Sequence, residues 1–168
     1  MTAEFVVAAP RIFAVLLAVV LLIVLLSMFI KRGSIVRKIT ALVIVLVVLG
    51  IVAFLFYRPT IVAVGEQGIA VKRFRERTVP WKDVIEAEWI EDLSVSEYRP
   101  ARRIVGVGLG AYKLGKFRLQ NGAAVQVVME QDRDALFIGT ARENYLFGLD
   151  ENDRLVEAVG RYLEVGAR

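Results

Sequence analysis

The 168-residue sequence contains neither cysteine nor histidine. Without cysteine the chain can form no disulfide and present no thiolate nucleophile. Without histidine it lacks the side chain that proteins use most often for acid–base catalysis near neutral pH and for zinc binding. The sequence therefore points away from an enzyme, and we assign no catalytic, cofactor-binding or metal-binding residue.

Acidic side chains are almost missing from the first third of the chain. Residues 1–59 contain Glu4 as their single acid against six basic residues, a net charge of +5, whereas residues 60–168 carry a net charge of −1. The basic pI of about 9.6 thus reflects the N-terminal part. Because the C-terminal part is not basic, it lacks the electrostatic footprint of a nucleic-acid-binding domain, and we expect no nucleic-acid partner.

Polar residues are scarce within two long segments. The nineteen residues Ile12–Ile30 include one polar side chain, and the nineteen residues Ile39–Tyr57 include two, one near each end. A helix of that length spans roughly 28 Å, close to the hydrocarbon thickness of a bilayer. We therefore predict a transmembrane hairpin within residues 1–59, with helices at about 11–30 and 39–57.

The segment between the two runs, residues 31–38, has basic side chains at four of its eight positions. A short loop with this density of positive charge normally stays in the cytoplasm. Both chain ends, and any domain after the hairpin, then lie outside. Arg58 and the basic residues at 72–77 argue the other way, but charges in a translocated domain count for less. The charge pattern favours an extracytoplasmic domain.

From residue 60 onward apolar and polar residues alternate, as they do in half-buried β-strands. Residues 92–103 are polar and contain Pro100, which favours a loop. Asn121-Gly122 is a strong signal for a tight hairpin turn, with Phe117 and Leu119 on the inner face before it. After the turn, Val125, Val127 and Met129 form the inner face of the returning strand. The expected strands are 61–65, 69–74, 78–81, 84–91, 116–120, 123–129, 136–140 and 145–149.

The last segment changes to a helical period. Asp150 is a good N-cap residue, and the apolar stripe that follows indicates an amphipathic helix near the C-terminus. We therefore predict a mainly β, α+β domain over residues 60–168, with about seven or eight antiparallel strands covered by one helix.

Three stretches carry a family resemblance: Val79-Pro-Trp81-Lys-Asp83-Val84, Gly115-Lys-Phe117-Arg-Leu-Gln-Asn121-Gly122, and Tyr145-Leu-Phe-Gly-Leu-Asp150 before the last helix. Together with two preceding apolar helices, they resemble the membrane-anchored bacterial pleckstrin-homology (PH-like) domain proteins. The resemblance implies an antiparallel β-barrel or sandwich capped by a C-terminal helix, in a multi-pass protein of the bacterial plasma membrane. These motifs are structural, so they say almost nothing about activity.

The densest polar feature of the domain is the basic cluster Lys72, Arg73, Arg75 and Arg77. Eukaryotic PH domains often bind inositol phosphates with basic residues near their first two strands. Such residues attract anionic headgroups, each contributing roughly 1 kcal/mol near the surface. The alternative is a solvated hairpin with acidic partners on neighbouring strands, such as Glu66, Glu76 or Glu88.

Other candidate groups are weaker. Arg99, Arg102 and Arg103 flank the expected loop, where they either extend the basic patch toward lipid or a protein partner, or are solvated as loop residues usually are. Gly106-Val-Gly108-Leu-Gly110-Ala111 matches a dinucleotide-binding pattern, but no helix follows it to receive a phosphate. We therefore expect no cofactor there, and regard this stretch as a mobile or contact segment. Trp81 is either a core aromatic or an interfacial anchor.

We predict a non-enzymatic interaction module, fixed in the lipid bilayer by its hairpin, that organises or regulates a membrane protein partner. Two alternatives remain open. The first is binding or sensing of anionic lipid headgroups through the cluster at 72–77. The second is an accessory subunit of a membrane complex that acts through its helices. Self-association into a homo-oligomer is compatible with each.

Overall fold

The computed structural model describes residues 2–7, 12–30, 35–56, 59–73 and 76–166. The chain divides into two compact units, and the first seven residues belong to the larger one, which comprises Met1–Val7 and Thr60–Arg168. The smaller unit is Ala8–Pro59. The expected division into 1–59 and 60–168 differs from this in one respect: the N-terminal segment joins the β unit.

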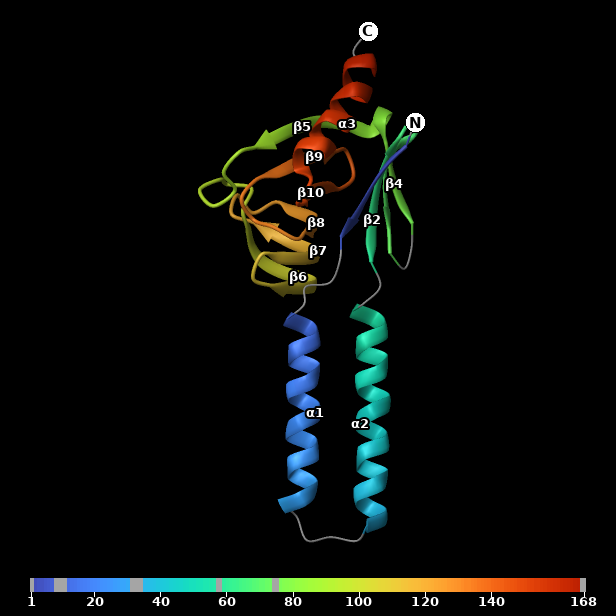
Figure 1. The fold of residues 1–168 in the computed structure, drawn as a ribbon. Coiled ribbons are helices and arrows are strands. Elements are labelled where there is room, and N and C mark those ends of the chain that lie inside the picture. Colours follow the sequence, from blue (N-terminus) through green and yellow to red (C-terminus); the bar gives the residue numbers. More distant parts are fainter. Residues whose placement is uncertain (1, 8–11, 31–34, 57–58, 74–75, 167–168) are drawn as a thin grey trace. The chain divides into compact units, whose positions relative to one another are not determined.

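The smaller unit contains helices α1 (Ile12–Ile30) and α2 (Ile35–Phe56), which contact each other (Figure 1). No proline interrupts the sequence between residues 12 and 56, so neither helix is broken. α2 begins earlier than expected, and its first turn includes Arg37 and Lys38. Within the described residues, no helix has both the length and the apolarity needed to cross a membrane. The predicted membrane-spanning role of the hairpin is not supported by this result.

The described strands of the larger unit form two sheets (Figure 1). The four-stranded sheet has the order β1-β2-β3-β4, with β1 at Ala3–Val7, β2 at Thr60–Gly65, β3 at Gly68–Lys72 and β4 at Arg77–Pro80. The six-stranded sheet has the order β5-β9-β10-β8-β7-β6. Its strands are β5 (Val84–Ile90), β6 (Pro100–Leu109), β7 (Tyr112–Leu119), β8 (Ala124–Met129), β9 (Ala135–Thr140) and β10 (Asn144–Gly148).

Three features differ from the expected antiparallel barrel or sandwich. Neither sheet closes into a barrel in the part of the chain that is described. β10 pairs with β8 in parallel and with β9 in antiparallel orientation. Strand β1, which the alternation did not predict, pairs with β2 from Ala3↔Val64 to Val7↔Thr60. The result is a mainly β sandwich with a C-terminal helix, as in a PH-like fold.

The expected loop at 92–103 was partly wrong, because β6 already begins at Pro100. Its register against β7 shifts between Pro100 and Arg102 and again between Arg103 and Val105. These bulges break the period of two that would otherwise reveal the strand. The glycine-rich segment 106–111, expected as a mobile or contact segment, consists of the end of this strand, up to Leu109, and the turn at Gly110 and Ala111.

The main core cluster lies on the six-stranded sheet. The inner positions expected from alternation are confirmed, because Phe117, Leu119, Val125, Val127 and Met129 are all buried. Burying a side chain of this kind contributes about 1.5–3 kcal/mol. This sheet is therefore the stable platform of the β unit.

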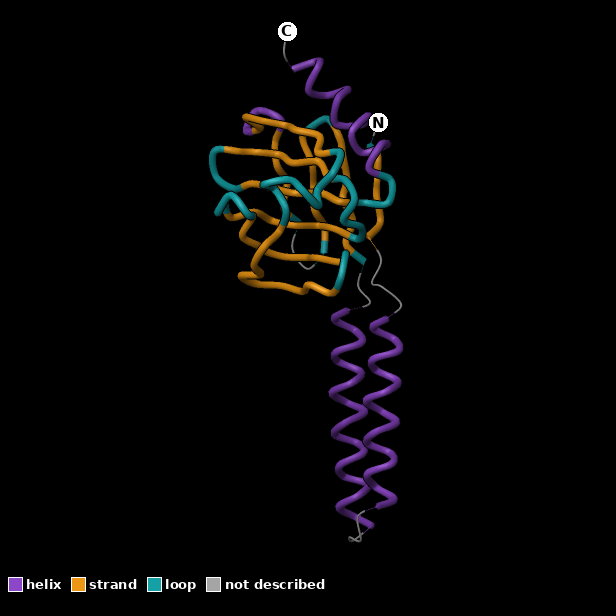
Figure 2. The backbone as a smooth tube through the Cα atoms, turned by 90° about the vertical axis from the view of Figure 1, so that its left-hand side faces the viewer, coloured by secondary structure: helices purple, strands orange, loops and turns teal. Residues whose placement is uncertain are grey.

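Helix α3 (Asn152–Gly166) contacts β2 of one sheet and β9 of the other, and Figure 2 shows it beside the strands of the β unit. Its apolar stripe buries Leu155 and Val159. Tyr162 stacks on Trp81 with ring centroids 5.3 Å apart, and the Trp81 indole N–H donates a hydrogen bond of 2.8 Å to the Gly65 carbonyl. Trp81 thus joins the first sheet to α3, as a structural aromatic.

Candidate functional site between the two sheets

A cavity of about 570 Å³ opens between the two sheets of the β unit. Its apolar wall is formed by Val71 on β3, Val105 on β6, Leu114 on β7, and Val127 and Val128 on β8. Cavities of this volume are in the range that binds small molecules, which also need a few convergent polar groups.

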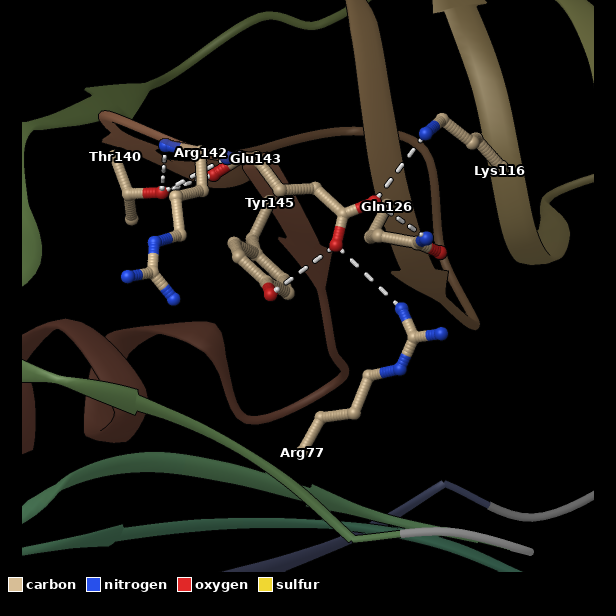
Figure 3. A network of polar contacts seen from close by, with 7 residues as sticks. All are labelled: Arg77, Lys116, Gln126, Thr140, Arg142, Glu143 and Tyr145. Atoms are coloured by element: carbon tan, nitrogen blue, oxygen red, sulfur yellow. Dashed lines mark hydrogen bonds and ion pairs between the residues drawn. The ribbon is translucent and has the colours of Figure 1, made fainter.

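The polar groups at the cavity converge on Glu143, just before β10 (Figure 3). Its Oε1 accepts hydrogen bonds from Gln126 Nε2 at 2.9 Å and from Lys116 Nζ at 3.4 Å. Its Oε2 contacts Arg77 Nη1 at 3.5 Å and accepts a bond from the Tyr145 hydroxyl at 3.4 Å. The four partners of this carboxylate all line the cavity.

The turn between β9 and β10 fixes the position of Glu143. The Thr140 hydroxyl donates to the Glu143 carbonyl at 2.6 Å, and accepts from the backbone N–H groups of Glu143 at 3.0 Å and Arg142 at 3.3 Å. A threonine at the end of a strand readily makes such local bonds to the backbone. The carboxylate is therefore presented by a well-bonded turn.

Burial alone would raise the pKa of the Glu143 carboxyl, but its neighbours outweigh that effect. The hydrogen bonds from Gln126 and Lys116, with the charges of Lys116 and Arg77, hold its pKa below the ordinary value. Burial raises the pKa of the Tyr145 hydroxyl, and the negative charge of Glu143 adds to this. The carboxylate is thus ionised and the tyrosine is neutral at neutral pH.

Thr60 contributes a further polar group to the cavity lining. It is 1% exposed, and its hydroxyl has no hydrogen-bond partner among the described residues. Leaving a buried hydroxyl without a partner typically costs 1–3 kcal/mol.

A protein-family model described as Bacterial PH domain matches residues 61–162. The chain belongs to the bacterial PH domain family. No match was found among curated proteins or among solved structures. A PH-like domain suggests an interaction module. Its partner has to be inferred from the surfaces of this chain.

The structure of the PH domain separates the basic residues that the sequence grouped. Arg73 and Arg77 line the cavity, whereas Lys72 pairs with Glu76 at 3.5 Å, the kind of partner a solvated hairpin provides. Arg75 lies outside the described residues. The cluster at 72–77 is therefore not one uniform surface in the part that is described.

The second basic group lies at the edge of the six-stranded sheet. Arg102 and Arg103 are exposed residues of β6. Arg99 precedes the strand and donates a hydrogen bond of 3.2 Å to the Ser94 carbonyl. None of the three is among the residues that line the cavity, so they do not extend the Arg73–Arg77 group there.

The sequence did not single out Lys116, Gln126 or Glu143. A signal for Lys116 was present, because the alternation that places Phe117 inward puts its neighbour on the opposite face. Glu143 has no such signal, since it belongs to a turn and meets Arg77 66 positions away. Among the described residues, no group of three acidic side chains is arranged to hold a metal ion.

The dinucleotide-like glycine pattern has a structural explanation. Gly106 pairs with Gly115 across β6 and β7, with φ angles of 126° and 124°. A Cβ atom on Gly106 would lie 2.1 Å from the Leu114 carbonyl oxygen, and one on Gly115 would lie 2.3 Å from that of Val105. These glycines permit a close backbone approach at the cavity wall, which no other residue allows.

Proposed function

We propose that this chain is a non-enzymatic interaction module, held at the bacterial cell membrane by its helical hairpin, whose PH domain binds a membrane protein partner. The observation that carries the proposal is the outer edge of β6. Among the described strands, β6 pairs only with β7, and residues 101–106 are exposed. An edge strand of this kind offers backbone donors and acceptors to an added strand of a partner.

The two halves of β6 differ in how open they are. The first half carries Pro100, two arginines and both register shifts, features that normally protect a sheet edge. From Val105 to Leu109 the pairing with β7 is regular. Val105 is 68% exposed and Ile104 is 45% exposed. We therefore assign the partner contact to the regular half together with the adjoining residue Ile104.

The apolar surface of the hairpin supports its place in a membrane. Many large apolar side chains of α1 and α2 are exposed, among them Val15, Ile23, Ile44 and Val47. A continuous apolar surface of this kind normally meets lipid or another protein. With the basic segment 31–38 in the cytoplasm, the PH domain is extracytoplasmic in our proposal.

Photo-crosslinking in native membranes tests the partner surface. A photoreactive residue at Val107, half-exposed in the regular part of β6, is expected to crosslink one membrane protein. Ile104→Asp is expected to abolish that product, because a charge on the edge opposes strand addition. The matched substitution is Ile85→Asp on β5, where Ile85 is 74% exposed at the other edge of the same sheet, and it should leave the product unchanged. Equal loss with both variants contradicts the assignment to β6.

Salt separates this function from headgroup binding. At about 1 M salt the Debye length falls to roughly 3 Å, so contacts made by Lys72, Arg73 and Arg77 weaken steeply. An apolar strand-edge contact persists at that salt concentration, so loss of the crosslink in salt would favour the headgroup alternative.

The side of the membrane on which the PH domain lies has a direct test, because the chain has no native cysteine. A cysteine at Asn121 should react with an impermeant maleimide on intact cells, and labelling only after lysis would place the domain in the cytoplasm.

A further inference from the structure

The inter-sheet cavity is large and open to solvent, and its wall is mainly apolar. At about 30 Å³ per molecule, its 570 Å³ would hold roughly nineteen waters. Val71, Val105, Leu114, Val127 and Val128 offer these waters no hydrogen bonds. Transfer of an apolar guest from water to such a wall is favourable.

Basic side chains predominate among the charged residues that line the cavity. Arg73, Arg77 and Lys116 line it, and none of the described lining residues is acidic. Glu143 contacts two of these cations, at 3.5 Å from Arg77 and 3.4 Å from Lys116. Charge-assisted bonds are usually 2.7–2.9 Å. Both cations are therefore loosely held and can also serve an anion that enters the cavity.

The Thr60 hydroxyl is an independent sign of a missing ligand. It is buried in the lining and lacks a hydrogen-bond partner among the described residues. Buried polar groups in native proteins are nearly always hydrogen-bonded. A ligand with an oxygen atom next to Thr60 would satisfy this group.

We propose that the inter-sheet cavity of the PH domain binds a single-chain anionic amphiphile, with its acyl chain along the valine and leucine wall and its head at the cationic side chains. The head is a carboxylate or a phosphate, because both accept hydrogen bonds from Arg, Lys and Thr donors. The volume suits one chain rather than the two of a bilayer phospholipid. The cavity shares Val105 and Gly106 with the half of β6 that we assign to the partner, but binding of the amphiphile does not depend on that partner.

The test is photolabelling of the full-length chain in phosphatidylcholine vesicles with palmitate that carries a diazirine near its chain end. Labelled peptides are mapped by mass spectrometry, and those from the PH domain are counted. Labelling is expected on β3, β6, β7 and β8. Unlabelled palmitate and lysophosphatidic acid compete if the site takes either head. Competition by palmitate alone identifies the preferred head as a carboxylate, and competition by lysophosphatidic acid alone identifies it as a phosphate. Equal competition by uncharged hexadecanol overturns the anionic part of the proposal.

Two neighbouring residues of β6 provide a matched pair of variants. Val105→Trp fills the cavity from an exposed position and should reduce PH-domain labelling about tenfold, the effect of roughly 1.4 kcal/mol. Ile104→Trp adds the same side chain at a residue that does not line the cavity, and should leave labelling unchanged. Equal labelling of both variants overturns the proposal.

Thr60→Val gives a second readout that structural damage cannot imitate. The substitution removes the buried hydroxyl at nearly constant volume, so the ligand-free protein should melt at the same or a higher temperature. Labelling should nevertheless fall severalfold, because the head loses a partner. Labelling at the level of the native chain, in a variant with raised thermal stability, means that the hydroxyl meets no ligand and contradicts the proposal.

Discussion

Strand β1 should contribute strongly to the stability of the PH domain, although a hairpin of two helices separates it from the other strands. Phe5 and Val7 are buried, while Val6 between them is exposed. Phe5→Ala removes a buried aromatic side chain and leaves a cavity, and Val6→Ala removes only exposed methyl groups. The two substitutions therefore compare docked and solvated faces of one strand.

The magnitude follows from burial. Truncating a buried phenylalanine to alanine costs about 3–5 kcal/mol, whereas an exposed substitution away from special features stays within about 0.5 kcal/mol. A domain typically has about 5–15 kcal/mol of stability in total. At about 4 °C per kcal/mol for a domain of this size, Phe5→Ala should lower the melting temperature by roughly 12–20 °C.

Tryptophan fluorescence is a suitable assay, because the two tryptophans of the chain, Trp81 and Trp89, both belong to the β unit. Thermal melts of the full-length variants then report on that unit. If Phe5→Ala and Val6→Ala melt within 2 °C of each other, about 0.5 kcal/mol, β1 is not docked as described and the reasoning fails.

As an extension, replacing residues 8–59 by Asn-Gly should give a folded domain, because Val7 and Thr60 are directly paired and a two-residue turn can join them.

Three further predictions concern stability. Gly115→Ala should cost about 3 kcal/mol or more in urea melts, from its positive φ and the Cβ clash, whereas Gly160→Ala in α3, with nothing within 4 Å, should gain about 0.5–1 kcal/mol. Because the Glu143 pKa is lowered in the folded state, its contribution is present above the ordinary value of 4.5 and is lost as pH falls through the folded pKa. Glu143→Gln should therefore reduce the loss of unfolding free energy on acidification, measured by urea melts at a series of pH values. An unchanged dependence of the unfolding free energy on pH would contradict this prediction. Trp81→Phe keeps the stack on Tyr162 but loses the 2.8 Å bond to the Gly65 carbonyl, so calorimetry should show a loss of about 1–2 kcal/mol.

Local alternation was sufficient to predict much of the six-stranded sheet. Phe117 and Val125 lie on strands whose period of two is regular, and both are buried as expected. β6 was not predicted, because its two register shifts and its pair of arginines interrupt the alternation of apolar and polar residues. β1 was not predicted, because a segment of five residues is too short to indicate a strand without its partner, and the partner strand begins only at Thr60. Pairing over such separations is a tertiary property.

The candidate site was less accessible to sequence reasoning. Density of charge drew attention to 72–77, yet the structure uses Arg73 and Arg77 together with Lys116 from the other sheet. Glu143 gave no signal, because its role depends on a turn and on strands that meet only in the folded domain. Local sequence can indicate a basic segment, but the balance of charge across a cavity depends on the arrangement of both sheets.

The direct pairing of Val7 with Thr60 also bears on biogenesis. If the hairpin lies in a bilayer, as we propose, the chain has to cross it an even number of times, because β1 and β2 belong to one sheet. A nascent chain that inserted a single helix would leave β1 on the far side of the membrane. Its β2 strand would then remain an uncovered edge, prone to aggregation and open to proteolysis. In that arrangement the first sheet can be completed only when both helices of the hairpin have inserted.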